Sequence, residues 1–339
     1  MFEASRFLSR RAIRVDHPEW GPWTPLFALQ TTMKRSAQPL ISVIIPVLNS
    51  REVIETAINS LAVQTFRGFE VILSDGGSVD CTVEYALKTL ALHCIEASAI
   101  VAKGSSIYGA INHAVRLARG QWVYVLGSDD TLYTPTVFDE VSRRLVVTSA
   151  DVVYGDAWFE ANGGFVYGGP FWLNRLAALN ICHQAIFYRA SRIAQVALTY
   201  YEKYELLADW DYNLKLFSCC RFEHMPLLIS RFSCTGRSST RTDERFEADR
   251  YANIVKYFGW RAYFLLSPDW LSRGVAPRPS RLNTIGLAMN RLVYKISRTI
   301  SPERQSLNLR QLVFAGSQLP LNLHPQGTQP QRPPKPMGA

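Results

Sequence analysis

Residues 39–49 read PLISVIIPVLN, a run of aliphatic and β-branched residues that ends abruptly in polar, turn-forming residues. Two later stretches have the same form: residues 69–78 read FEVILSDGGS, and residues 122–130 read WVYVLGSDD. Short apolar runs of this kind are typical of buried parallel strands. In an open α/β sheet, ligands bind at the carboxyl ends of such strands. We therefore expect the polar residues after the three runs to surround one ligand site.

The segments around these runs alternate between strand and helix patterns. The expected strands lie at 41–47, 69–74, 98–102, 121–127, 151–154 and 183–188. The expected helices lie at 51–64, 80–92, 107–119, 134–146, 209–217 and 240–258. A small hairpin is expected at the Asn-Gly-Gly turn of residues 162–164. This alternation predicts an α/β fold with a Rossmann-like, mostly parallel sheet covered by helices on both faces.

The composition indicates an ordinary globular chain. Of its 339 residues, 47% are hydrophobic and 19% are charged, and no apolar run approaches the ~18 residues needed to span a bilayer. Arg6, Arg10 and Arg11 lie near the start, but no apolar core follows them, so we predict no secretory signal. The cysteines form no Cys-x-x-Cys pair, which argues against a zinc site. Reduced thiols and a cytoplasmic location are the simplest interpretation.

Positive charge is concentrated in the C-terminal part of the chain. Residues 250–339 contain 13 Lys and Arg but only 2 Asp and Glu. An amphipathic helix is predicted at 284–300, with aliphatic residues on one face and basic residues on the other. A basic flank can bind nucleic acid, but the aromatic residues at 257–264 favour an anionic membrane surface. We therefore expect peripheral attachment to the inner face of the plasma membrane and no nucleic-acid partner.

The first candidate site follows the strand expected at 69–74. Asp75 begins the segment DGGSVD, and a carboxylate there can accept a hydrogen bond from the ring imide of uracil or guanine. Gly76 lets the backbone approach a ligand closely. The alternative is structural, with Ser78 or Asp80 capping the next helix. The dinucleotide fingerprint Gly-x-Gly-x-x-Gly is absent, which argues against a hydride-transfer enzyme.

Two adjacent acidic residues follow the strand expected at 121–127. Asp129 and Asp130 repel each other unless a cation neutralises them. Mg²⁺ or Mn²⁺ suits such oxygen ligands and usually also binds substrate phosphates. Such an ion would neutralise a departing diphosphate. The alternative is that the pair caps the helix expected at 134–146.

A third group of candidates lies further along the chain. Asp209 and Asp211 begin the helix expected at 209–217, where a carboxylate is either a general base or a helix cap. His183 and Gln184 stand at the start of the strand expected at 183–188. These two residues contact an acceptor or have a structural role.

Together these segments resemble the family-2 glycosyltransferases of the GT-A fold. The order and spacing of that family are found in SVIIPVLN at 42–49, DGGSVDCT at 75–82 and GSDD at 127–130. Three later segments are similar to the subgroup that decorates bacterial glycolipids and surface polysaccharides, which includes glycosyltransferases of mycobacterial phenolic glycolipid assembly. These segments are YGD at 154–156, NICHQAIFYR at 180–189 and ADWDYN at 208–213.

The resemblance implies that the donor is a nucleotide-diphosphate sugar. Pro46 and Asn49 would belong to the loop that walls the nucleotide. Asp75 would hold the nucleobase, with Gly76 and Ser78 in the same nucleotide-sugar site.

The resemblance also implies an inverting transfer to a lipid-linked or surface-glycan acceptor. Asp130 would bind Mg²⁺ or Mn²⁺ directly, with Asp129 as a further ligand nearer the ribose. Asp209 would be the catalytic base, and Asp211 is the alternative.

One segment departs from the subgroup, which usually reads Asp-x-Gly-Ile-Tyr-Asp-Ala-Met-Asn. Residues 104–112 read GSSIYGAIN here, so Gly104 and Gly109 replace both acids and leave the donor sugar open. The departure slightly favours one alternative, a catalytically inactive sugar-nucleotide sensor or scaffold of glycan assembly. A nucleotidyltransferase is disfavoured, because the loop after the first strand has no Gly-rich, basic sequence.

The same reasoning divides the chain into four regions. Residues 1–38 are an N-terminal extension without a clear period, expected to be loosely ordered. Residues 39–249 form the catalytic domain, with a nucleotide-sugar half at 39–133 and an acceptor half at 134–249. The last two regions are a basic amphipathic helical region at 250–316 and a Pro-rich tail at 317–339, predicted to be disordered.

Overall fold

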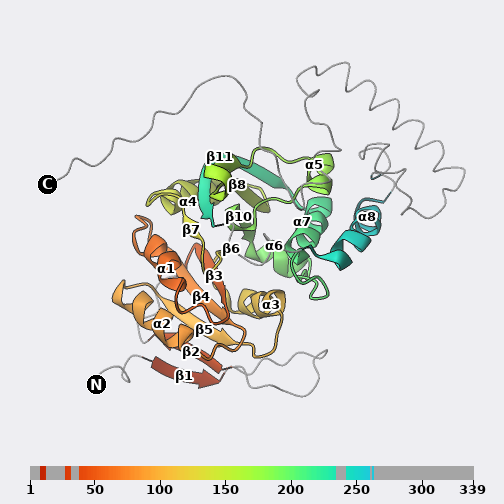
Figure 1. The fold of residues 1–339 in the computed structure, drawn as a ribbon. Coiled ribbons are helices and arrows are strands. Elements are labelled where there is room, and N and C mark those ends of the chain that lie inside the picture. The colour runs from red at the N-terminus through yellow and green to blue at the C-terminus, as the bar shows by residue number, and fades with distance from the viewer. Residues whose placement is uncertain (1–7, 13–26, 32–37, 234–241, 260–261, 263–339) are drawn as a thin grey trace, which may run out of the picture.

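The computed structural model describes residues 8–12, 27–31, 38–233, 242–259 and 262. In this part of the chain the strands form one 11-stranded sheet with helices on both faces (Figure 1). The strand order is β1-β2-β5-β4-β3-β6-β10-β8-β11-β7, and β9 pairs with β8 outside this path.

The centre of the sheet is parallel, as the sequence predicts. Its strands are β3 (Ile41–Val47), β4 (Phe69–Asp75), β5 (Ala97–Val101) and β6 (Trp122–Val125). β4 pairs in parallel with β3 and β5, and β3 pairs in parallel with β6. Because all four strands run in one direction, the loops after β3, β4 and β6 meet at one edge of the sheet.

The second half of the sheet is mixed. Its strands are β7 (Thr131–Leu132), β8 (Val152–Phe159), β9 (Phe165–Tyr167), β10 (Ile186–Arg189) and β11 (Phe222–Phe232). β10 runs antiparallel to both β6 and β8. The expected hairpin is present, since β9 pairs antiparallel with β8. The strand expected at 183–188 begins only at Ile186, because residues His183–Ala185 form the 3₁₀ turn η3.

The described parts of the N-terminal extension form a hairpin that the sequence analysis did not predict. β1 (Leu8–Ala12) pairs antiparallel with β2 (Phe27–Thr31), and β2 pairs antiparallel with β5. The extension therefore covers one edge of the parallel sheet. The expectation that it is loosely ordered is wrong for these two segments, because backbone pairing of β2 with β5, and of β1 with β2, orders chain that has no hydrophobic period of its own.

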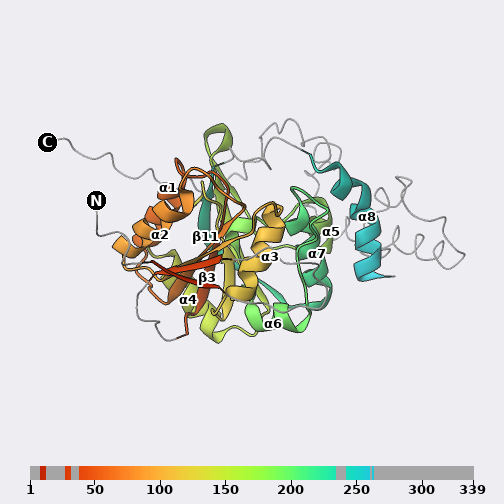
Figure 2. The ribbon, with the colours of Figure 1, turned by 90° about the horizontal axis from the view of Figure 1, so that it is seen from below.

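The two faces of the sheet carry different helices (Figures 1 and 2). One core packs the β3 side chains Val43 and Ile45 against α1 (Ile54–Ala62), α2 (Thr82–Leu92) and α4 (Val137–Val147). The alternate residue Ile44 faces the other core, where the helices are α3 (Ile107–Leu117), α5 (Leu173–Ala178), α6 (Ala190–Gln195), α7 (Ala208–Cys219) and α8 (Glu244–Phe258). Alternation along a strand buried on both faces explains why these runs are almost entirely apolar.

Helix α8 corrects the predicted domain boundary at residue 249, which falls inside it. Asp243 accepts a hydrogen bond from Phe246 N at the start of α8 and from the backbone N–H groups of Leu206 and Leu207, just before α7. Phe246 is fully buried in the core that α8 shares with α7. The folded body of the described residues therefore includes α8. The helix predicted at 284–300 and the tail at 317–339 lie outside the described residues.

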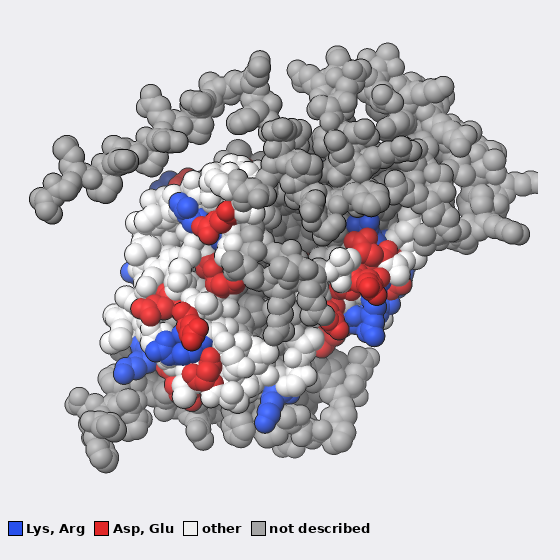
Figure 3. Space-filling view, viewed as in Figure 1, with Lys and Arg blue, Asp and Glu red and all other residues white. Residues whose placement is uncertain are grey.

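The described part of the chain contains no helix both long and apolar enough to cross a membrane. On the face shown in Figure 3, acidic and basic side chains of the described residues lie close together and form no broad basic patch. The basic excess of the sequence is therefore not displayed on this face of the described body.

Candidate active site

The loops after β3 and β4 are fastened to each other. Asn49 N donates to Ser78 Oγ at 2.8 Å, and Asn49 Oδ1 accepts from Val79 N at 3.0 Å. Asp75 is buried and accepts from Ser78 twice, from the backbone N at 2.9 Å and from Oγ at 2.6 Å. These contacts give the nucleotide side of the predicted site a fixed rim. They also engage Asp75 with its own loop, so its contact with a nucleobase stays a prediction.

Two details of this rim differ from expectation. Pro46 lies within β3 opposite Ser74, so the loop that follows begins only at Leu48. Gly77, with φ of 106°, is the position where the loop requires glycine, whereas a Cβ on Gly76 would meet Leu48 at an ordinary 3.5 Å. Gly76 therefore gives no evidence of close ligand approach by itself.

Asp80 has the structural role that was weighed against a binding role. Its carboxylate accepts from Thr82 N in the first turn of α2 and from Arg51 N in the loop after β3, both at 3.1 Å. The hydrogen bonds from Thr82 and Arg51 lower the pKa of Asp80, the Thr82 side chain having the largest effect. The N-cap position itself is Cys81, so Asp80 joins two loops and supports the helix start from one residue further back.

The acidic pair lies directly after β6, at the edge where the loops meet. Asp130 is only 2% exposed; its Oδ1 accepts from Ser233 N at 3.1 Å and its Oδ2 from Gln184 Nε2 at 2.9 Å. Asp129 Oδ2 accepts from Ser233 Oγ at 3.0 Å. A Cβ on Gly127 would lie 2.3 Å from Asp130 Oδ2, so glycine is needed there to leave room for the carboxylate.

The surroundings of Asp130 fit a divalent cation. Burial and the neighbouring Asp129 raise the pKa of Asp130 to about 7, so a second negative charge is costly here unless a cation compensates it. The described residues hold no group of three or more His, Cys, Asp or Glu side chains that could enclose a metal. Two carboxylates suit Mg²⁺ or Mn²⁺ nevertheless, because Mg²⁺ sites commonly use one or two carboxylates together with substrate phosphates.

The alternative that this pair caps a helix is wrong. The next helix, α4, begins at Val137 with Thr136 at its N-cap. The acidic pair is followed instead by β7, which pairs with β11.

The turn η3 connects the acidic pair with the neighbourhood of Asp209. Gln184 contacts Asp130 from this turn, and its backbone oxygen accepts from Tyr124 OH at 2.8 Å. His183 Nε2 lies 3.0 Å from Tyr200 OH. Burial lowers the pKa of His183 below its ordinary value of 6.5, and the Asp209 carboxylate opposes this effect. His183 is therefore mainly neutral at neutral pH and lies close enough to Asp209 to sense its charge.

Asp209 lies in the first turn of α7 and is 8% exposed. Its Oδ1 lies 3.0 Å from Tyr108 OH, and its Oδ2 accepts from Asn180 Nδ2 at 2.7 Å. Burial raises the pKa of Asp209, while His183, Tyr108 and backbone N–H groups of its own helical turn oppose the rise. The N-cap of α7 is Leu207, so Asp209 is not the capping residue. A buried carboxylate with raised proton affinity is the kind of group that acts as a general base.

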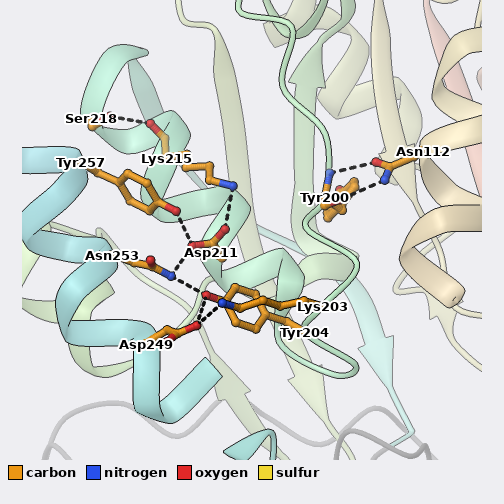
Figure 4. Close-up of polar contacts among 10 residues, drawn as sticks. All are labelled: Asn112, Tyr200, Lys203, Tyr204, Asp211, Lys215, Ser218, Asp249, Asn253 and Tyr257. Atoms are coloured by element: carbon orange, nitrogen blue, oxygen red, sulfur yellow. Dashed lines mark hydrogen bonds and ion pairs between the residues drawn. The ribbon is translucent and has the colours of Figure 1, made fainter. Parts of the chain in front are cut away.

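Asp211 lies on the opposite face of the same helix, between α7 and α8 (Figure 4). It is fully buried and pairs with Lys215 Nζ at 2.8 Å. Tyr257 OH donates to it at 2.7 Å and Asn253 Nδ2 at 3.0 Å, both from α8. With a cation and two donors, Asp211 fastens α8 to α7. The structure therefore favours Asp209 over Asp211 as the candidate base.

Three residues near these carboxylates were not assigned roles from the sequence. Asn180 stands inside the segment 180–189 that carries the family resemblance, and Tyr108 keeps the Ile-Tyr of the otherwise divergent segment 104–112, so these patterns could have pointed to both. Ser233 had no local signal, because it reaches the acidic pair only through the pairing of β11 with β7 and β8.

Comparison with known proteins shows which family the chain belongs to. The family model described as "Glycosyl transferase family 2" matches residues 42–189. A PGL/p-HBAD biosynthesis glycosyltransferase of Mycobacterium bovis (strain BCG / Pasteur 1173P2) is 36% identical over 218 residues, which cover 62% of this chain and 83% of that protein. The chain belongs to glycosyltransferase family 2. The family expected from the sequence is thus confirmed.

Two further similarities extend the comparison. The Escherichia coli protein named UDP-Glc:alpha-D-GlcNAc-diphosphoundecaprenol beta-1,3-glucosyltransferase WfaP is 25% identical over 232 residues, covering 66% of this chain and 88% of that protein. The crystal structure of S. aureus TarS 1-349 in complex with UDP superposes with a TM-score of 0.52 at 16% identity, covering 77% of this chain and 92% of that chain. The structural likeness confirms the GT-A fold of this glycosyltransferase.

Proposed function

We propose that this glycosyltransferase is a metal-dependent, inverting enzyme that uses a nucleotide-diphosphate sugar and a lipid-linked or surface-glycan acceptor. One observation supports this proposal above the others: Asp209 is a buried carboxylate with raised pKa that is held by neutral donors and interacts electrostatically with His183 of η3, the turn from which Gln184 contacts Asp130. Adjacent residues of one turn therefore lie near the proposed base and at the proposed phosphate-side site, which supports their acting on one substrate.

The proposed reaction is a single displacement at C1 of the donor sugar. Asp209 accepts the proton of the acceptor hydroxyl as that oxygen forms its bond to C1. The bond between C1 and the diphosphate oxygen breaks on the opposite side, and the nucleoside diphosphate leaves with the electron pair. Asp130 and Asp129 would hold Mg²⁺ or Mn²⁺, which when bound neutralises the charge of the leaving diphosphate.

The donor and acceptor classes are supported by the relatives. The names of the mycobacterial and E. coli proteins refer to phenolic-glycolipid-type biosynthesis and to a diphosphoundecaprenol-linked sugar, and the TarS crystal contains UDP. A nucleotide would lie against the rim made by Asn49, Asp75 and Ser78, beside Pro46 and Gly76. The nucleobase and the sugar of the donor are to be identified by the donor panel described below.

The replacement of two family acids by Gly104 and Gly109 does not remove negative charge from this region. A Cβ on Gly109 would lie 2.3 Å from Glu202 Oε2, and Glu202 Oε2 also accepts from Ser106 Oγ at 3.0 Å. The Glu202 carboxylate thus occupies the space into which a side chain at 109 would project. We infer that an acid from the segment before α7 substitutes for the missing one, which weakens the sensor or scaffold alternative.

A donor panel tests the proposed function. The full chain is incubated with Mn²⁺ and individual UDP-, GDP- and dTDP-sugars, with and without lipid-linked acceptors, and nucleoside diphosphate release is measured. We expect release from one donor class, stimulated by an acceptor and abolished by excess EDTA. Binding of a donor without release under any condition would instead support the sensor alternative.

Cellular location is a separate proposal. We propose that the chain is cytoplasmic and attaches peripherally to an anionic membrane surface through its C-terminal basic region, where lipid-linked acceptors are accessible. The uneven distribution of charge along the sequence supports this.

A further inference from the structure

We propose that Asn180, Asn213 and Tyr188 form a positioning chain that holds Asp209 in the orientation and protonation state needed for proton abstraction. This inference rests on the proposed role of Asp209 as the base. Neither the predicted site nor the family motifs assign a function to these three residues.

The hydrogen bonds of this chain run in one direction. Tyr188 OH donates to Asn213 Oδ1 at 2.8 Å, and Asn213 Nδ2 donates to Asn180 Oδ1 at 2.9 Å. Asn180 Nδ2 then donates to Asp209 Oδ2 at 2.7 Å. Tyr188 and Asn213 are buried, in β10 and α7 respectively. An ionised carboxylate only accepts hydrogen bonds, so Asp209 fixes which way each amide points, and the chain in turn fixes Oδ2.

The partner of the other oxygen of Asp209, Oδ1, is a hydroxyl that has a second acceptor. Tyr108 OH lies 2.6 Å from Leu206 O and 3.0 Å from Asp209 Oδ1. A tyrosine hydroxyl has one proton, and the carbonyl of Leu206 is the closer acceptor. Asn180 is therefore the firmer donor to Asp209. Oδ1 is left as the oxygen that gains the proton, and once protonated it can donate to Tyr108.

The titratable groups that face Asp209 are mainly uncharged, so its carboxylate is stabilised by neutral donors. They are His183 from η3, Tyr108 from α3, Tyr167 from β9, Tyr188 from β10 and Tyr200 from the segment before α7. Burial raises the pKa of each tyrosine and lowers that of His183, so all five are mainly uncharged at neutral pH. None of the ion pairs among the described residues includes Asp209. Besides His183, Tyr108 and the backbone N–H groups of its own helical turn, the amide of Asn180 is the side-chain donor at the shorter distance from Asp209, 2.7 Å.

The main test replaces that amide. Asn180→Leu keeps a similar volume but removes the donor, so the charged form of Asp209 is disfavoured. We expect the acid limb of the kcat/KM profile to move up by about 1 to 2 pH units, because a hydrogen bond donated to a carboxylate lowers its pKa by about that much and the variant loses this bond. Asn180→Asp should move it further, since two carboxylates would then share one site. Tyr188→Phe, at the far end, should give a smaller shift in the same direction.

Asn253 provides a matched control. Its amide donates to Asp211 on the opposite face of α7, so Asn253→Leu removes the same kind of contact from the other carboxylate. We expect a lower thermal midpoint and an unchanged pH profile. A profile that shifts equally in Asn253→Leu and Asn180→Leu would mean that general loosening of α7 is the cause, and would overturn the proposal.

A measurement without substrate separates this inference from the proposed function. The side-chain carboxyl ¹³C signal of Asp209, identified by its loss in Asp209→Asn, is titrated in the full chain and in each variant. A pKa that rises in Asn180→Leu and less in Tyr188→Phe supports the positioning chain even if Asp209→Asn retains transfer, which would refute only the base. A pKa that is unchanged in folded Asn180→Leu and Tyr188→Phe overturns the positioning chain, whatever the activity.

Discussion

Asp209 and Asp211 stand two residues apart in the first turn of α7, yet the two faces of the helix give them opposite surroundings. Asp211 has a cation, Lys215, and two donors from α8 (Figure 4). Asp209 has an asparagine amide and a shared tyrosine hydroxyl, and burial raises its pKa. Both carboxylates are buried, so burial alone does not distinguish them.

The difference between the partners separates a structural carboxylate, Asp211, from the proposed base, Asp209. The cation and the two donors hold Asp211 in the contact between α7 and α8. A carboxylate held only by neutral donors keeps a fixed position while its affinity for a proton rises. One helix thus has a face that joins it to α8 and a face that is suited to chemistry.

The largest expected effect on turnover comes from the acidic pair Asp129 and Asp130, which η3 contacts through Gln184. Asp130→Asn removes a proposed metal ligand, and we expect turnover to fall about a thousandfold, equivalent to about 4 kcal/mol. The thermal midpoint should not fall, since a buried charge is removed and the Asp211 face is untouched. Steady-state kinetics with Mn²⁺ measures the loss, and wild-type activity that persists in excess EDTA would contradict it.

The next effect belongs to the structural face. Asp211→Asn leaves Lys215 without its partner, and we expect a loss of about 2 kcal/mol in the free energy of unfolding. Turnover per folded molecule should stay within about threefold of wild type, because Asp211 does not contact the reacting atoms. Denaturant unfolding and kinetics on the same sample check both statements. A stable but inactive Asp211→Asn protein would reverse the assignment of the two faces.

A smaller effect is expected in the pH dependence of stability. The folded-state pKa of Asp209 is raised above its unfolded value near 3.8, so its contribution favours folding at low pH and is lost as pH rises through the folded pKa. Above the folded-state pKa, wild type must bury an ionised carboxylate, which costs free energy. Asp209→Asn removes that charge, so above this pKa the variant should be as stable as wild type or more stable. Unfolding curves at a series of pH values test this, and a large loss of stability at neutral pH would show that the charge of Asp209 is itself structural.

The smallest expected effect concerns what lies beyond α8. Full-length protein should bind anionic vesicles, with each Lys or Arg near the surface contributing about 1 kcal/mol to the binding free energy. Binding should be weaker at high salt. A chain ending at residue 259 keeps α8 on the Asp211 face and should lose vesicle binding but retain transfer to a soluble acceptor. Co-sedimentation measures binding; equal binding to neutral and anionic vesicles, or to the shortened chain, would refute the attachment.

The parallel half of this fold could be predicted from the sequence, because each strand has a local apolar pattern and each polar end follows it directly. The same local logic pointed to Asp75, Asp129 and Asp130 as candidates, whereas the role of Asp209 as a base came from the family resemblance. It could not show that Gln184 and Ser233 hold Asp130, because these residues are separated from it by 54 and 103 positions. Those contacts exist because β10 pairs antiparallel with β6 and β11 pairs antiparallel with β7. No local sequence pattern specifies these pairings.

The family resemblance preferred Asp209 to Asp211, but the local sequence pattern could not decide between them. Two residues of a helix that are two positions apart point to different sides, but the pattern of α7 does not say which side meets α8. The answer depends on Asn253 and Tyr257, which lie outside the segment that resembles the family. Asn180 was visible in that segment, but its role depends on the folded position of α7.

The most direct test of the difference between the two faces is the single-turnover transfer rate of Asp209→Asn, with Mn²⁺ and a saturating donor from the panel. Loss of a general base predicts a rate about a thousandfold below wild type, with unchanged donor affinity and an unchanged or higher thermal midpoint. Asp211→Asn, measured in parallel, should transfer at nearly the wild-type rate. Transfer by Asp209→Asn within about tenfold of wild type would contradict the central claim that this face of α7 supplies the base.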